Sequence, residues 1–136
     1  MNYQEFKTHS KNVVDTLVMG FAFSNEQFDK LLTEKGWDKD NMVRCTMGGF
    51  CPKEHLLDNI KKLNDLTELK GELLKDDDFL YGALLYELYN HEYAYTYDTE
   101  QTLESLGLKF DELSDSQKEV LKKATKHILS KYDYWK

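Results

Sequence analysis

The stretch from Asp76 to Asp98 reads DDDFLYGALLYELYNHEYAYTYD, and its first half predicts the central helix of the fold. Three aspartates open it, where unpaired N–H groups and the positive end of the helix dipole favour negative charge. Apolar side chains then recur every three or four residues, which places them on one helix face. These positions are Phe79, Leu80, Ala83, Leu84 and Leu88, with His91 on the same face. The pattern predicts a largely buried helix that ends between residues 90 and 92.

The second half of the stretch has a different period. Tyr93, Tyr95 and Tyr97 alternate with Ala94 and Thr96, which is typical of a short extended segment. We therefore expect 93–97 to be a strand candidate whose three tyrosines are either buried together or presented together.

Helix start and stop signals divide the rest of the chain. Ser24 and Ser114 are each followed three residues later by glutamine, which predicts capping boxes. Gly36 and Gly107 each follow an apolar helical pattern and predict left-handed stops. The expected helices cover residues 3–19, 24–36, 52–64, 65–73 and 99–106, with a last one from 114 that buries Tyr132 and Trp135.

The strand signals are few. Met42–Met47 is the best candidate, and Tyr93–Tyr97 is the segment with which it could pair. A lone two-stranded ribbon is marginal unless helices cover it. The sequence thus predicts a mainly α fold, a single compact domain over 1–136 of about six helices with at most one short two-stranded ribbon.

Composition limits the class of protein. A chain of 136 residues with 40% hydrophobic and 32% charged residues is ordinary for a globular domain. No apolar run is long enough to span a membrane, and the first residues lack the pattern of a signal peptide. The two cysteines are too few for a disulfide framework. We expect a cytoplasmic protein with reduced thiols and no membrane partner.

Charge is unevenly distributed along the chain. The formal net charge is −7, and residues 72–119 hold 13 acidic residues against three lysines. Such a segment repels a phosphate backbone, so direct nucleic-acid binding is disfavoured. It attracts a basic protein partner. The alternative is that the charge serves only solubility.

Glu87 and His91 lie four residues apart, so a helix would point both side chains the same way. That spacing can present two ligands to a metal, but the chain has no third ligand in a known zinc pattern. A partly buried, hydrogen-bonded histidine is the favoured interpretation. We expect no metal and no cofactor.

Cys45, Cys51 and His55 are spaced more widely than the ligands of common zinc sites. A catalytic thiol at Cys51 is the alternative, if it lies at the N-terminus of a helix that starts with Pro52. The favoured interpretation is two small apolar side chains near a turn. Gly48-Gly49 could likewise bind an anion, but a tight turn is the default. The sequence predicts no catalytic residue.

Tyrosine density is the most unusual feature of the chain. Six of the nine tyrosines lie between residues 76 and 98. Tyrosine offers large area and a polar group at low entropic cost, so clusters of it often form interfaces. The alternative is that the tyrosines line the rim of the core. The candidate binding residues are Tyr89, His91, Glu92, Tyr93, Tyr95, Tyr97 and Asp98.

Four segments resemble a family of small bacterial proteins of unknown function. They read KDDDFLYGALLYELYNHEY, TYDTEQTLESLGL, FAFSNEQF and MGGF. The resemblance implies a context, because such proteins often belong to mobile elements. It implies a regulator or inhibitor of another protein rather than a metabolic enzyme, and it implies no fold, activity or site residue.

The leading hypothesis is an acidic protein–protein interaction module that regulates or inhibits a basic, nucleic-acid-binding partner. The rival is a small enzyme or ligand-binding protein with a pocket around His91, in which Glu87, His91 and Glu92 supply acid–base groups. A homodimer that buries the tyrosine edge is a third hypothesis. The sequence favours a role other than catalysis.

Overall fold

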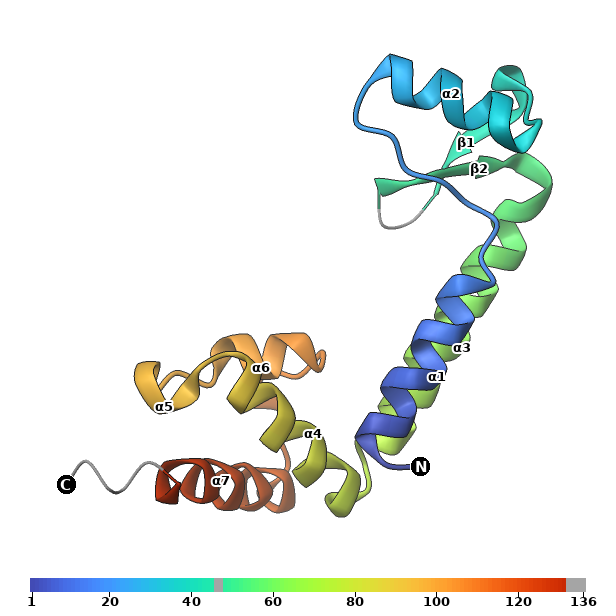
Figure 1. The fold of residues 1–136 in the computed structure, drawn as a ribbon. Coiled ribbons are helices and arrows are strands. Elements are labelled where there is room, and N and C mark those ends of the chain that lie inside the picture. The colour runs from blue at the N-terminus through green and yellow to red at the C-terminus, as the bar shows by residue number, and fades with distance from the viewer. Residues whose placement is uncertain (46–47, 132–136) are drawn as a thin grey trace. The chain divides into compact units, whose positions relative to one another are not determined.

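The computed structural model describes residues 1–45 and 48–131. Within them it has seven α-helices, three short 3₁₀ turns and one antiparallel ribbon (Figure 1). The helices are α1 (Tyr3–Asp15), α2 (Asn25–Lys35), α3 (Leu56–Leu73), α4 (Asp77–Asn90), α5 (Tyr93–Thr96), α6 (Glu100–Ser105) and α7 (Asp115–Ser130). The 3₁₀ turns cover Lys39–Asn41, Lys53–His55 and Phe110–Glu112. The predicted mainly α class with one two-stranded ribbon is confirmed.

Contacts group the chain into two compact units, which are described separately. The hairpin unit is Thr8–Leu69, and the α4 unit is Met1–Lys7 together with Lys70–Lys136. The prediction of one domain over residues 1–136 stays a prediction.

In the hairpin unit, β1 (Met42–Arg44) pairs with β2 (Phe50–Pro52). The sequence correctly predicts a strand that includes Met42–Arg44. The predicted partner strand, Tyr93–Tyr97, is wrong. The close approach of another segment explains why Phe50 is extended, because Phe50 and Gly20 exchange both backbone hydrogen bonds at 2.9 Å. A Cβ atom at Gly49 would lie 2.9 Å from the Gly20 carbonyl oxygen, so this approach requires glycine.

The first helix ends at Asp15 instead of Met19, and tertiary contacts explain the difference. The buried Asn59 accepts a hydrogen bond from Val18 N–H at 3.1 Å and donates one to the Val18 carbonyl at 2.9 Å. These bonds satisfy the Val18 backbone outside a helix. The predicted break near residue 65 is also absent, because α3 is continuous from Leu56 to Leu73.

The predicted stops and caps are largely confirmed. Gly36 has φ 68°, and Trp37 N–H donates to the Leu32 carbonyl at 3.0 Å. Gly107 has φ 72° and ends the turn after α6. Ser114 forms its capping box at the start of α7. The expected burial of Tyr132 and Trp135 lies outside the described residues.

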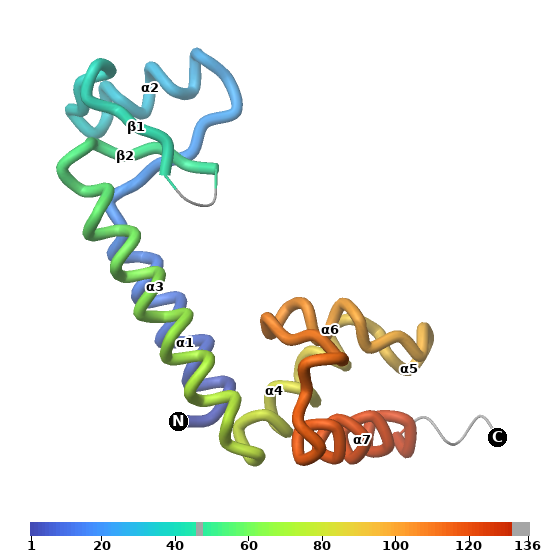
Figure 2. Tube along the Cα trace, turned by 180° about the vertical axis from the view of Figure 1, so that it is seen from behind, coloured from blue at the N-terminus to red at the C-terminus, as the bar shows by residue number. Residues whose placement is uncertain are grey.

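Helix α4 is the centre of the α4 unit, as its sequence predicts. The Asp76 carboxylate caps it by accepting from Asp78 N–H at 2.8 Å and from Phe79 N–H at 3.1 Å. Its apolar face is buried, and α5, α6 and α7 all contact it (Figure 2). The buried side chains of α4 and α7 that form this core are Phe79, Leu80, Ala83, Leu84, Leu88, Val120, Leu121, Ala124 and Ile128.

The prediction that Tyr93–Tyr97 is extended is wrong. Tyr93–Thr96 forms one helical turn, α5, and Tyr97 N–H donates to the Tyr93 carbonyl at 2.8 Å. Helical geometry brings the rings of Tyr93 and Tyr97 together edge to face, with 6.1 Å between centroids. The alternating tyrosines therefore do not share one side of a strand.

Candidate functional site

The candidate site is the α4–α5 corner, which comprises residues 88–98. Helix α4 stops at Asn90, and the chain turns through Glu92, whose φ is 58°. Helix α5 then ends at Tyr97, whose φ is 56°. In the described part of the chain these are the two non-glycine residues with positive φ. Such conformations cost about 1 kcal/mol or more each, so the corner is a locally strained connection.

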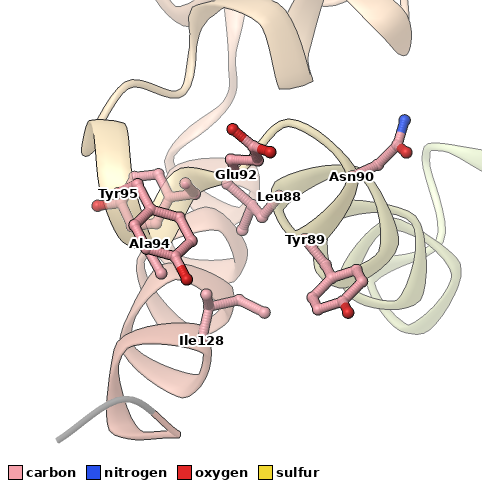
Figure 3. Close-up of a pocket in the computed structure, with 8 residues that line it drawn as sticks. Leu88, Tyr89, Asn90, Glu92, Ala94, Tyr95 and Ile128 are labelled. Atoms are coloured by element: carbon pink, nitrogen blue, oxygen red, sulfur yellow. The ribbon is translucent and has the colours of Figure 1, made fainter.

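A cavity of about 320 Å³ lies at this corner (Figure 3). Tyr89, Tyr93, Tyr95 and Glu92 line it, and Asn90 and Ala94 complete its rim. The fully buried Leu88 and Ile128 form its apolar base. Figure 3 shows the rings of Tyr89 and Tyr95 on opposite sides of this base. The arrangement is a small aromatic-walled depression open to solvent.

Exposure of the tyrosines at the corner is high. Tyr89 is 70% exposed, Tyr95 is 77% exposed and Tyr97 is 68% exposed. Most large aromatic side chains bury more of their area than this. The corner therefore presents a large exposed aromatic surface.

Negative charge accompanies this aromatic area. Glu92, Asp98 and Glu100 are all exposed. Of the 13 acidic residues between 72 and 119, Glu87 alone is buried. Eight described residues line the cavity, and none of these eight is a lysine or arginine. The local potential therefore favours a cationic ligand.

The structure brings four of the predicted binding residues together around the cavity. They are Tyr89, Glu92, Tyr93 and Tyr95. Tyr97 lies beside them through its ring contact with Tyr93. The exposed Asp98 accepts a hydrogen bond from Glu100 N–H at 2.9 Å and thereby supports the start of α6. His91 is not among the cavity residues.

His91 belongs instead to a buried polar cluster around Glu87. Glu87 is 4% exposed, and its side chain accepts a hydrogen bond from the Tyr3 hydroxyl at 2.6 Å. Lys7 Nζ lies 3.8 Å from the same carboxylate. His91 Nε2 lies 3.3 Å from Glu87 Oε2, but its orientation makes no hydrogen bond with any described group. His91 and Glu87 are therefore close neighbours whose Nε2 and Oε2 atoms form no hydrogen bond with each other.

Burial is the main cause of the pKa shifts around this cluster. Burial, and then the hydrogen bond to the Glu87 carboxylate, hold the pKa of Tyr3 well above its ordinary value. Burial lowers the pKa of Lys70, although the charge of Glu87 opposes this shift. Lys70 Nζ donates to the Ser105 carbonyl at 2.9 Å. These contacts tie the first residues of α1 and the end of α3 to the rest of the α4 unit.

Sequence reasoning gave Glu87 an acid–base or ligand role and missed its partner Tyr3. The two residues are 84 positions apart, so no local signal joins them. An acid among apolar residues of the central helix was the available signal, because a buried carboxylate needs partners. Within the described residues, no three His, Cys, Asp or Glu side chains lie close enough to hold a metal ion.

The cysteines lie in the hairpin unit. Cys51 is fully buried in β2, so it is not at a helix N-terminus as a thiolate site would require. Burial and the neighbouring Cys51 raise the pKa of Cys45 to about 11. Cys45 is therefore a neutral thiol near pH 7. A second cavity, of about 520 Å³, lies beside it and is lined in part by Phe28, Arg44 and Phe50.

One protein-family model, described as a family of unknown function, matches residues 2–131. This match confirms the predicted resemblance to a family of unknown function. Neither a curated protein nor a solved structure matches the chain. Among the described residues, no helix has the length and apolar character needed to cross a membrane.

Proposed function

We propose that this chain, which belongs to the DUF7659 family, is an acidic interaction module that docks a basic protein segment on its α4–α5 corner. The observation that carries the proposal is the coincidence of exposed tyrosines and exposed carboxylates around one cavity. Aromatic area supplies contact energy, and the carboxylates supply attraction and orientation.

The charge distribution supports a basic partner. Residues 72–119 carry a net charge of −10, and nearly all of their carboxylates are exposed. Exposed charges of one sign speed the encounter with an oppositely charged surface, and salt weakens this effect. A protein that binds nucleic acid has such a basic surface. The proposed partner is therefore a nucleic-acid-binding protein, whose basic surface this chain would cover.

The resemblance adds a biological setting to the proposal. A small bacterial protein from a mobile element gains from regulating or inhibiting a host protein. A cytoplasmic location and direct binding to protein rather than nucleic acid belong to the same proposal. The acidic surface favours this role because it repels the phosphate backbone itself.

The two alternatives have less support. The rival pocket around His91 would need that side chain in a cavity, but His91 faces Glu87 and is not among the described residues that line the corner cavity. A symmetric homodimer would place the same acidic corner on both sides of its interface. Like charges would then face each other, which is unfavourable.

Neutralising two equal sets of carboxylates tests the proposal. The corner set is Glu92→Gln and Asp98→Asn, where asparagine keeps the oxygen that accepts from Glu100 N–H. The control set is Asp111→Asn and Glu119→Gln, which are exposed acids outside residues 88–98. Both variants lose the same net charge.

Calorimetry with a decalysine peptide measures the effect at about 50 mM and about 300 mM salt. We expect the wild type to bind at the lower salt concentration and to weaken strongly at the higher one. The corner variant should bind several-fold more weakly than the control variant. Equal losses in the two variants, or no binding at low salt, would overturn the proposal.

A further inference from the structure

The geometry points to a more specific role for the cavity at the α4–α5 corner. We infer that it is a receptor for one arginine side chain of the basic partner. The inference rests on the proposed function and deepens it, because it names the anchoring group. Four features of the cavity suit an arginine: its aromatic walls, the carboxylate at its rim, its apolar base and its fixed shape.

The walls are suited to a flat cation. Tyr89 and Tyr95 lie on opposite sides of the cavity base, and Tyr93 lines the cavity with them (Figure 3). A guanidinium group is planar and weakly hydrated, so it stacks on an aromatic face more readily than an ammonium group does. Two or three tyrosine rings around one cavity therefore favour arginine over lysine.

The rim supplies the compensating charge. Glu92 lines the cavity and is exposed, so its carboxylate can turn toward a bound cation. A carboxylate can accept two parallel hydrogen bonds from one guanidinium. Among the lining residues that the structure describes there is no lysine or arginine to compete for this carboxylate. Glu92 is thus the predicted ion-pair partner.

The base matches the rest of the side chain. Leu88 is fully buried and Ile128 is buried, so the bottom of the cavity is apolar. An arginine side chain carries an apolar stem below its charged group. A volume of about 320 Å³ is at the small end for ligand pockets, which suits one side chain better than a large cofactor.

The cavity is also preformed to a considerable degree. Glu92 is fixed in a left-handed conformation between α4 and α5. A preformed site loses less entropy when it binds. This explains how one side chain could give useful discrimination on an exposed surface.

Paired peptides test the inference. Two peptides of equal length and charge, decaarginine and decalysine, are titrated against the full chain and its variants. We expect the wild type to prefer arginine by about fivefold, the size of a cation–π contribution of two rings. Tyr89→Leu and Glu92→Gln should each reduce this preference toward one.

Tyr97→Leu is the matched control, because Tyr97 is an exposed tyrosine of the same corner that does not line the cavity. It should keep the preference for arginine even if both affinities fall. Far-ultraviolet circular dichroism checks that every variant is folded. The preference ratio, rather than affinity alone, is the quantity compared.

The outcomes separate this inference from the proposed function. A wild type that binds both peptides equally, with the corner carboxylates still required, would overturn the arginine receptor and keep the docking surface. Equal loss of preference in Tyr97→Leu and Tyr89→Leu would also overturn it. A chain that binds neither peptide at low salt would overturn both.

Discussion

Glu87 and Tyr89 lie two residues apart on helix α4, yet they occupy opposite environments. Glu87 is an acid that is 4% exposed and accepts a hydrogen bond from the Tyr3 hydroxyl. Tyr89 is an aromatic residue that is 70% exposed and lines a cavity. The usual preference, with aromatic groups inside and charges outside, is reversed at both positions.

This contrast shows that the buried polar cluster and the exposed corner of the α4 unit have different roles. The buried cluster joins Tyr3 and Lys7 of α1 to Glu87 of α4, so its polar groups hold segments that are distant in sequence. The exposed tyrosines of the corner, Tyr89, Tyr95 and Tyr97, bury little of their area in the fold. We therefore expect changes in the cluster to affect stability and changes at the corner to affect binding.

The largest effect should come from breaking the buried hydrogen bond. Tyr3→Phe removes the hydroxyl that donates to the Glu87 carboxylate. We expect the free energy of unfolding to fall by about 1.5–3 kcal/mol, because a buried carboxylate loses a donor. Urea denaturation measures this change. Tyr89→Phe is the control and should change stability by less than about 0.5 kcal/mol; equal effects would abolish the contrast.

The free energy of unfolding at alkaline pH should also distinguish the buried cluster from the exposed corner. Burial and the Glu87 carboxylate raise the pKa of Tyr3 in the folded state, whereas the unfolded value is about 10. The unfolded chain then releases this proton first, so the Tyr3 contribution is complete below pH of about 10 and is lost as pH rises further.

The expected slope from Tyr3 is about −1.4 kcal/mol per pH unit above that point. Tyr3→Phe should show a shallower decrease over the same range, since the other titrating groups, including Cys45, remain in both proteins. Denaturation curves at successive pH values provide the comparison. Parallel curves for the two proteins would show that Tyr3 does not titrate differently on unfolding.

A smaller effect of opposite sign is expected at the corner. Glu92 holds a left-handed conformation with no side-chain capping bond. Glu92→Gly should raise the free energy of unfolding by roughly 0.5–1 kcal/mol, because glycine adopts this conformation without strain. The same change should weaken binding of the decaarginine peptide. Stability gained together with binding lost is the pattern expected where function retains local strain.

Glu104→Gly is the control for this substitution. Glu104 is an exposed residue within α6, where glycine should destabilise the helix by about 1 kcal/mol. If Glu92→Gly also lowered the free energy of unfolding, this would show that the Glu92 side chain supports the fold. The corner would then resemble the buried cluster instead of contrasting with it.

The local signals in the sequence were sufficient for α2, α4 and α7. Asp76, Ser114 and Gly36 act within one turn of the backbone groups that they cap, so their effects could be predicted without tertiary structure. The apolar period of α4 correctly predicted its central position because burial follows directly from that period.

The errors occurred where distant contacts or an unusual backbone decide the structure. The short strand that contains Phe50 pairs with Met42–Arg44 and bridges to Gly20, and no local pattern shows these contacts. Helix α5 follows a left-handed Glu92, a conformation that a glutamate gives no reason to expect. The alternating tyrosines therefore suggested a strand, although the candidate binding residues were still named because residue type, not conformation, identified them.

Chemical-shift mapping by NMR tests the central claim most directly. Isotope-labelled protein is titrated with decalysine at low salt, and the backbone amides that shift are located in the chain. We predict that the largest shifts fall on residues 88–98 and that, at the same peptide concentration, they are much smaller in the corner variant. Shifts confined to Thr8–Leu69, or spread evenly over all exposed acidic residues, would contradict a docking surface at the α4–α5 corner.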